Sequence, residues 1–146
     1  MECFTKAADR GLATAYNQLG IWYERGKGVA QDEKKAVECF RKAAEKEHAD
    51  AMNSLGLCYE YGIGVNTNEK KAIRWYTKAA LYGSLEGQYN LGVCYEYGYG
   101  TIKQEHKKAV EWYTKAAEQG YASARYKMAT CHEQGIGVEK DIKKAM

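Results

Sequence analysis

The chain has 146 residues and a formal net charge of +3, from 22 Lys and Arg against 19 Asp and Glu, and its length predicts one domain of average size. Hydrophobic residues at 45% and charged residues at 28% are ordinary for a globular protein and exclude a disordered chain. No apolar run approaches the roughly 18 to 20 residues that cross a bilayer, and the start of the chain lacks the regions of a signal peptide. We therefore expect a soluble protein without a membrane partner, cytoplasmic on condition that the flanking sequence carries no targeting signal.

One sequence unit recurs along the whole chain at steps of 36 or 37 residues. The clearest marker is a Leu-Gly pair, with copies at Leu19-Gly20, Leu55-Gly56 and Leu91-Gly92 and a degenerate copy at Met128-Ala129. Lys-Lys-Ala and Lys-Ala-Ala triplets recur in the same phase, and all 15 Gly have a place in the unit or in a variant of it. In chain order, the units are a partial second helix at 1–11, complete helix pairs at 12–47, 48–83 and 84–120, and a truncated pair at 121–146.

Each unit is predicted to form two helices and no strand. Apolar residues at helical spacing mark the first helix of the first complete unit: Ala15, Leu19, Trp22 and Tyr23. A second stripe at the same spacing follows, and in that unit it is formed by Ala36, Phe40, Ala43 and Ala44.

Glycines and polar caps predict where these helices begin and end. The first helix of each unit ends at a Gly-x-Gly pair, at positions 26/28, 62/64, 98/100 and 135/137. N-caps for the second helix are expected at Asp32, Asn68 and Asp141, with Glu105 as a poorer cap. The second helix is expected to end at Gly11, Gly83 and Gly120, whereas Glu47 holds that place once and predicts a looser or slightly strained turn there.

The unit resembles the Sel1-like repeat, a relative of the tetratricopeptide repeat. The residues that carry the resemblance are Ala15, Leu19-Gly20, Tyr23, Gly26-x-Gly28-Val29, Asp32, Ala36 and Lys42-Ala43-Ala44. Local departures are Met128-Ala129, His132, Thr101 and Glu47. The resemblance covers the whole chain and implies an all-α fold, a right-handed α-α superhelix (solenoid) of helical hairpins with the first helices on its concave side. It also implies a protein-interaction scaffold or adaptor.

Both ends of the chain fall inside a second helix, because Met1 and Met146 take the place of Val37 in the repeat. This indicates an excerpt of a longer array. An alternative function follows, structural self-assembly, in which Asp141 to Met146 of one molecule and Glu2 to Arg10 of the next complete one helix head-to-tail.

The sequence holds no convincing catalytic, metal or disulfide site, so we expect no enzyme and no cofactor. Each complete unit pairs one Trp with one Cys, namely Trp22 with Cys39, Cys58 with Trp75, and Cys94 with Trp112, which predicts buried thiols that stay unbridged. The three His lie in different contexts without any Cys-x-x-Cys, which argues against zinc. Cys131 and His132 are adjacent, but neighbouring helical residues diverge and no orienting acid accompanies them.

Nucleic-acid binding is also not expected. The Lys pairs that open the second helices have acidic neighbours, the net charge is only +3, and no aromatic platform interleaves with them. They predict a solvated convex face.

The remaining face of the first helices is the candidate binding site. The residues on this face that we expect to bind protein are Asn17, Ile21, Glu24, Asn53, Leu57, Glu60, Tyr61, Tyr89, Val93, Glu96, Tyr97, Tyr126 and Glu133. An apolar row beside an acidic row, with several Tyr, suits a peptide or partner protein with basic and apolar residues. A second interpretation stays open, in which the apolar row packs between neighbouring helices and the Glu row is solvated.

Overall fold

The computed structural model describes residues 2–26 and 31–135, with only the backbone described for residues 2–10. Within these ranges it contains helices and no strands, which confirms the predicted all-α class. The helices are α1 (Glu2–Arg25), α2 (Glu33–Glu45), α3 (Ala49–Tyr61), α4 (Glu69–Leu81), α5 (Leu85–Tyr97), α6 (His106–Glu118) and α7 (Ala122–Gln134).

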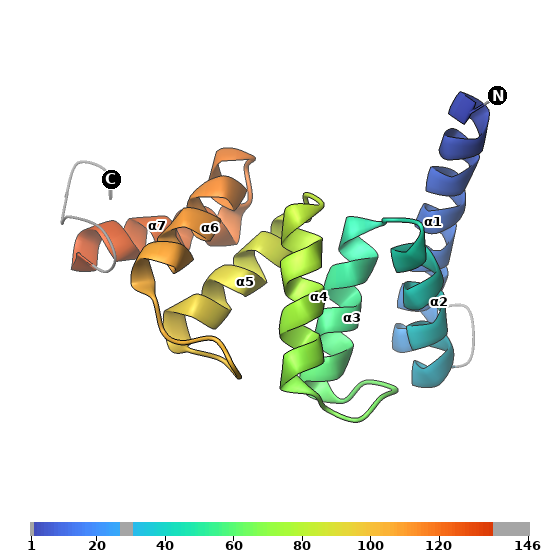
Figure 1. The fold of residues 1–146 in the computed structure, drawn as a ribbon, viewed down its shortest axis with the longest axis horizontal. Helices are drawn as coiled ribbons and strands as arrows, with labels where there is room; N and C mark the ends of the chain where they lie inside the picture. The colour runs from blue at the N-terminus through green and yellow to red at the C-terminus, as the bar shows by residue number, and fades with distance from the viewer. Residues whose placement is uncertain (1, 27–30, 136–146) are drawn as a thin grey trace.

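The helices form a solenoid of hairpins that runs from one side of the molecule to the other (Figure 1). Each helix packs on the next along the chain, as α1 on α2, α3 on α4 and α5 on α6 within hairpins, and as α2 on α3, α4 on α5 and α6 on α7 between them. Helices α3 and α5, the first helices of adjacent hairpins, also contact each other directly. This contact positions the candidate site.

The Leu-Gly pair joins the two helices of each hairpin. A buried aromatic ring of the second helix lies over the glycine of the first, in the pairs Phe40 on Gly20, Tyr76 on Gly56 and Tyr113 on Gly92. A Cβ atom on any of these glycines would lie within 2.5 to 2.6 Å of a ring carbon. The repeated glycine therefore admits the ring that forms the centre of each hairpin.

The predicted caps are confirmed at the described positions. Gly26, Gly62, Gly98 and Gly135 follow the first helices with φ near +70°, a left-handed conformation that favours glycine. The Asp32 and Asn68 side chains each accept a hydrogen bond at 3.1 Å from the backbone N–H three residues on. Glu105 makes no such bond, as expected of a poorer cap. Gly28, Gly137 and Asp141 lie outside the described residues.

The helix end predicted at Gly11 is wrong, because α1 continues through this residue to Arg25. Gly11 has no left-handed φ, whereas the equivalent Gly83 and Gly120 have φ of +97° and +93°. Those two turns each join a pair of packed helices, α4 with α5 and α6 with α7, whereas residues 2–25 form one continuous helix. Glycine also tolerates a right-handed helix, at a cost of about 1 kcal/mol relative to alanine.

The strain predicted at Glu47 is confirmed, and it leads to a stability prediction. Glu47 is the one residue other than glycine with a positive φ, +63°, in the part of the chain that the structure describes. Replacing Glu47 with Gly should raise the free energy of unfolding by about 1 kcal/mol, because a side chain in this conformation costs about 1–2 kcal/mol, less the entropy that glycine loses on folding. Urea denaturation measures the change.

The matched control for this variant is Gly83→Ala. A Cβ there meets nothing within 4 Å, so its expected loss of stability comes from φ alone. Equal stability of Glu47→Gly and the original chain would show that this turn is not strained.

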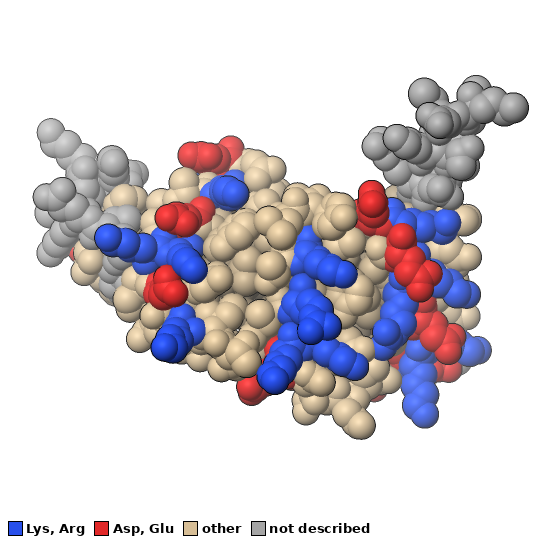
Figure 2. Space-filling model, viewed as in Figure 1, with Lys and Arg blue, Asp and Glu red and all other residues tan. Residues whose placement is uncertain are grey.

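The Lys pairs at the start of α2, α4 and α6 are exposed, and Figure 2 shows Lys and Arg gathered in bands over α2 and α4. The second Lys of each pair also covers a tyrosine ring of the first helix, in the pairs Lys35 over Tyr23, Lys71 over Tyr59 and Lys108 over Tyr95, at 5.3 to 5.6 Å from the ring centroid. Lys35, Lys71 and Lys108 are therefore exposed to solvent and also form cation–π contacts with the first helix of their hairpin.

No helix in the described ranges has the length and apolar character needed to cross a membrane.

Candidate functional site

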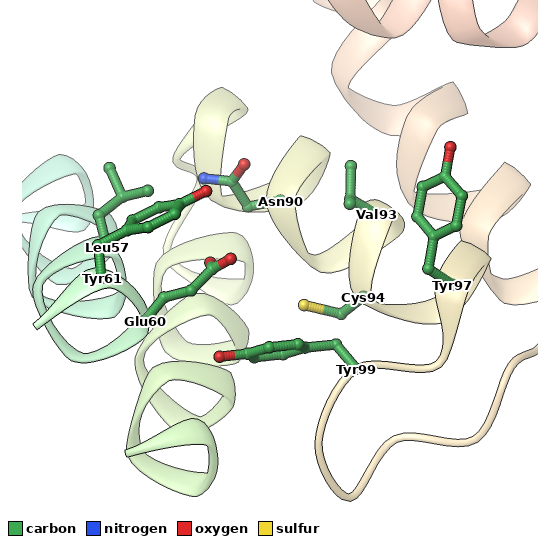
Figure 3. Close-up of a pocket in the computed structure, with 8 residues that line it drawn as sticks. All are labelled: Leu57, Glu60, Tyr61, Asn90, Val93, Cys94, Tyr97 and Tyr99. Carbon is green, nitrogen blue, oxygen red and sulfur yellow. The ribbon is translucent and has the colours of Figure 1, made fainter. Parts of the chain in front are cut away.

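A cleft of about 160 Å³ lies between α3 and α5 on the predicted binding face. Figure 3 shows its lining residues: Leu57, Glu60 and Tyr61 from α3, Asn90, Val93, Cys94 and Tyr97 from α5, and Tyr99 from the loop that follows α5. We call this feature the α3–α5 cleft. Five of the lining residues belong to the predicted set, namely Leu57, Glu60, Tyr61, Val93 and Tyr97. The structure thus brings part of the predicted set together at one cleft.

The α3–α5 cleft combines an apolar lining with exposed aromatic rings. Leu57 and Val93 are half-buried, and Cys94 is buried beside them. Tyr61 and Tyr97, one repeat apart, are each 66% exposed. Large rings at this exposure next to an apolar hollow are a common feature of surfaces that bind protein.

Glu60 gives the α3–α5 cleft a negative charge. The buried Tyr76 hydroxyl donates a hydrogen bond to Glu60 Oε1 at 2.5 Å, which holds the carboxylate at the cleft. The charge of Glu60 is the main cause that raises the pKa of Tyr61, with burial and a hydrogen bond to Glu60 adding to it. Burial, followed by the charges of Glu60 and Glu69, raises the pKa of Tyr99 to about 12. A negative potential of this kind favours a cationic ligand.

The equivalent carboxylate one repeat later, Glu96, has an internal cation. It accepts hydrogen bonds from the Tyr113 hydroxyl at 2.5 Å and from Lys127 Nζ at 3.1 Å. Lys127 Nζ also donates to the Tyr97 hydroxyl at 3.3 Å and lies 5.3 Å from the centre of the Tyr97 ring. Burial raises the pKa of Glu96, but the bonds from Tyr113 and Lys127 and the Lys127 charge outweigh it, so the net pKa is lowered.

Asn90, Cys94 and Tyr99 of the α3–α5 cleft were not predicted from the sequence, and neither was Lys127. Lys127 occupies the repeat position of Ser54 and Asn90, one residue before the Leu-Gly place. The alignment of the repeats could have indicated Lys127, since it is the one charged residue at a position that otherwise holds neutral polar residues.

The other predicted residues lie apart from the α3–α5 cleft. Asn53 is 1% exposed and forms internal hydrogen bonds, from Asn90 Nδ2 at 2.8 Å and to Glu86 Oε2 at 3.4 Å. Tyr89 packs against the rings of Tyr113 and Tyr121, with centroids 5.7 and 5.6 Å away.

The residues of α1 and α7 do not line the α3–α5 cleft either. Ile21 packs against the core cluster that includes Phe40, Leu55 and Cys58. Burial is the main cause that raises the pKa of Glu24. Asn17 is half-buried on α1, while Tyr126, 75% exposed, and Glu133, also exposed, lie on α7.

The four cysteines whose side chains the structure describes are part of the core. Cys39, Cys58, Cys94 and Cys131 are free and buried. Burial is the largest cause that raises the pKa of Cys58 and of Cys94 to about 12, so both are protonated at neutral pH. Cys58 and Trp75 pack in one core cluster, whereas Trp22 of the first pair is 42% exposed.

The described residues contain no group of three His, Cys, Asp or Glu that could hold a metal ion. His48 instead caps α3, where its Nδ1 accepts a hydrogen bond from the Ala51 N–H at 3.1 Å.

Stacked helical hairpins with a cleft between successive first helices define a helical-repeat solenoid. The family model of the Sel1 repeat matches residues 1–12, 13–48, 49–84, 85–121 and 122–146. The chain therefore belongs to the Sel1 repeat family, whose members commonly serve as protein-interaction scaffolds.

Solved structures of similar proteins agree with this family. A Sel1 repeat protein from Oxalobacter formigenes is 36% identical with a TM-score of 0.83, over 95% of this chain and 55% of that one. A protective antigen with an SLR fold from uropathogenic Escherichia coli is 36% identical with a TM-score of 0.81, over 96% of this chain and 30% of that one. Cysteine rich protein B of Helicobacter pylori is 25% identical with a TM-score of 0.64, over 82% of this chain and 93% of that one. No curated protein matches the chain.

This chain spans about half the length of the Oxalobacter protein and less than a third of the Escherichia coli antigen.

Proposed function

We propose that this chain is a non-catalytic adaptor that binds an extended segment of a partner protein across α3 and α5. The observation that carries the proposal is the α3–α5 cleft, an apolar hollow beside Tyr61 and Tyr97, two rings that are each 66% exposed. The apolar part of a partner side chain would enter between Leu57 and Val93, and the rings would cover it. Basic residues of the partner would complement the charge of Glu60.

The expected energetics follow from this arrangement. A few anchors in a desolvated hollow carry most of the binding energy at protein interfaces, and tyrosine is enriched among them. Tyr61 and Tyr97 expose a large apolar area at low entropic cost, because their side chains have few rotatable bonds. Affinity should therefore depend on these two rings much more than on the total contact area.

Replacing Tyr97 with Ala should weaken peptide binding by about tenfold or more, since truncation of such an anchor costs about 1–2 kcal/mol or more. The ligands are peptides selected from a displayed random library with the 146-residue chain as bait. Fluorescence anisotropy measures their dissociation constants for the original chain, Tyr97→Ala and Tyr61→Ala, and circular dichroism verifies that helicity is unchanged.

Tyr82→Ala is the matched control, because Tyr82 is 53% exposed but caps the opposite end of α4 and does not line the α3–α5 cleft. It should leave the affinity unchanged. Equal affinity of the original chain, Tyr61→Ala and Tyr97→Ala for the selected peptides would refute the proposal that peptides bind at the α3–α5 cleft.

A further inference from the structure

Two successive pairs of first helices carry the same side-chain arrangement with one difference. In the α5–α7 pair it consists of Glu96, Tyr97, Tyr113 and Lys127, and in the α3–α5 pair of Glu60, Tyr61, Tyr76 and Asn90. Each residue of one set lies 36 or 37 positions from its counterpart in the other. Each Glu accepts a hydrogen bond at 2.5 Å from the buried Tyr of the second helix. The two arrangements can therefore be compared within one molecule, since the α5–α7 pair contains a cation, Lys127, and the α3–α5 pair does not.

Lys127 shows what the arrangement binds when a lysine is supplied. Its ammonium contacts a carboxylate oxygen of Glu96 at 3.1 Å, the Tyr97 hydroxyl at 3.3 Å and the face of the Tyr97 ring at 5.3 Å. The Lys127 side chain is 22% exposed and that of Glu96 13%, so the pair is largely removed from solvent. Burial lowers the pKa of Lys127, but hydrogen bonds to Glu96 and Tyr97 outweigh this and raise it.

The α3–α5 cleft lacks this cation. Asn90 stands in the place of Lys127, and its amide Nδ2 donates sideways to Asn53 Oδ1 at 2.8 Å. No Lys, Arg or His lines the cleft, and Glu60 has no ion pair with residues 11–26 or 31–135, whose side chains the structure describes. The uncompensated charge of Glu60 is instead the main cause that raises the pKa of Tyr61.

We propose that the α3–α5 cleft receives a lysine side chain of the partner, with its ammonium against Glu60 and Tyr61 as that of Lys127 lies against Glu96 and Tyr97. This inference rests on the proposed function and specifies its ligand. The apolar stem of a lysine matches the lining by Leu57 and Val93, and its ammonium supplies three donors to oxygen acceptors at the far end. Charge-assisted hydrogen bonds and the ring face reinforce each other in a partly desolvated site.

A stability experiment without any ligand tests whether the α3–α5 cleft binds a cation favourably. Asn90→Lys and Asn90→Met both lose the hydrogen bond to Asn53 and both carry an unbranched side chain, so they differ mainly in the ammonium. Asn90→Lys should melt about 2–4 °C above Asn90→Met at neutral pH in low salt. The difference should disappear when each variant also carries Glu60→Gln. Equal melting temperatures of the two Asn90 variants would overturn the inference.

A binding experiment tests the lysine of the partner. Peptides selected on the original chain are resynthesised with each lysine replaced by norleucine, which keeps the stem and removes the ammonium. One such replacement should weaken binding by about tenfold, and Asn90→Lys should bind the original peptides more weakly than Asn90→Met does. Asn90→Lys would place its own ammonium in the cleft and repel that of the peptide.

The outcomes separate this inference from the proposed function. Peptides that require Tyr97 but bind equally well with norleucine at every lysine would support binding at the α3–α5 cleft and overturn the lysine site. Peptides whose affinity is unchanged by Tyr61→Ala and by Tyr97→Ala would refute binding at the α3–α5 cleft, and the lysine site with it.

Discussion

Replacing Gly56 with Ala should lower the free energy of unfolding by about 1–3 kcal/mol, although alanine is the better helix former. A Cβ at Gly56 would lie 2.5 Å from two carbons of the Tyr76 ring. This ring is 1% exposed, and its hydroxyl is bound to Glu60, so it has little room to move. Chemical denaturation measures the loss.

Gly11→Ala provides the matched control in the same chain. Gly11 lies inside α1, and a Cβ there would meet nothing within 4 Å. Alanine at this position should raise the free energy of unfolding by up to about 1 kcal/mol, since glycine pays the larger backbone entropy in a helix. Opposite signs for the two variants are expected. A Gly56→Ala variant as stable as the original chain would contradict the packing described for Tyr76.

Displacement of Tyr76 should also reach the binding face. The Tyr76 hydroxyl holds the Glu60 carboxylate at the α3–α5 cleft, so a shifted ring removes that bond. The glycine of the Leu-Gly pair thus connects the centre of the hairpin to the proposed binding site.

Replacing Glu96 with Gln should destabilise the protein by about 2 kcal/mol at neutral pH, between the values typical of exposed and of buried ion pairs. The substitution leaves Lys127 and the Tyr113 hydroxyl without their charged acceptor. Because the Glu96 side chain is only 13% exposed, solvent compensates little of this loss. Urea denaturation at pH 7 and low salt measures the difference.

The pH dependence of this difference has a definite sign. The pKa of Glu96 in the folded chain is below its ordinary 4.5, so its contribution is complete above that value and is lost as the pH falls through the folded pKa. The pKa of Lys127 is raised above 10.5, so its contribution is complete below that value and is lost as the pH rises through the folded pKa. The original chain and Glu96→Gln should therefore differ most between about pH 5 and 10 and converge in acid.

Glu105→Gln is the control for the ion pair. Glu105 lies 3.8 Å from Lys108 within the first turn of α6, and the two side chains are 48% and 51% exposed. An exposed pair of this kind contributes at most a few tenths of a kcal/mol. If Glu96→Gln changed stability no more than Glu105→Gln, or changed it equally at pH 3 and pH 7, the Glu96–Lys127 pair would not stabilise this repeat.

The local features of the fold could be predicted from the sequence because each depends on neighbouring residues. The Gly-x-Gly pairs, the caps at Asp32 and Asn68, the poor cap at Glu105 and the strained turn at Glu47 all follow from backbone conformation and from hydrogen bonds over three or four residues. Gly11 is the exception, because a glycine is compatible with a helix and with a turn, and only packing on both sides selects the turn.

The sequence by itself determined the repeat, the two helices of each unit and the helix face on which the candidate binding residues lie, since helical periodicity is a property of the chain alone. Only the tertiary structure decided which of those residues meet. The spacing and angle of successive hairpins gathered Leu57, Glu60, Tyr61, Val93 and Tyr97 around one cleft, while Asn53 was buried. The same packing brought Lys127 to Glu96 across 31 positions, and such a contact depends on how helices are placed in space, which local sequence patterns do not encode.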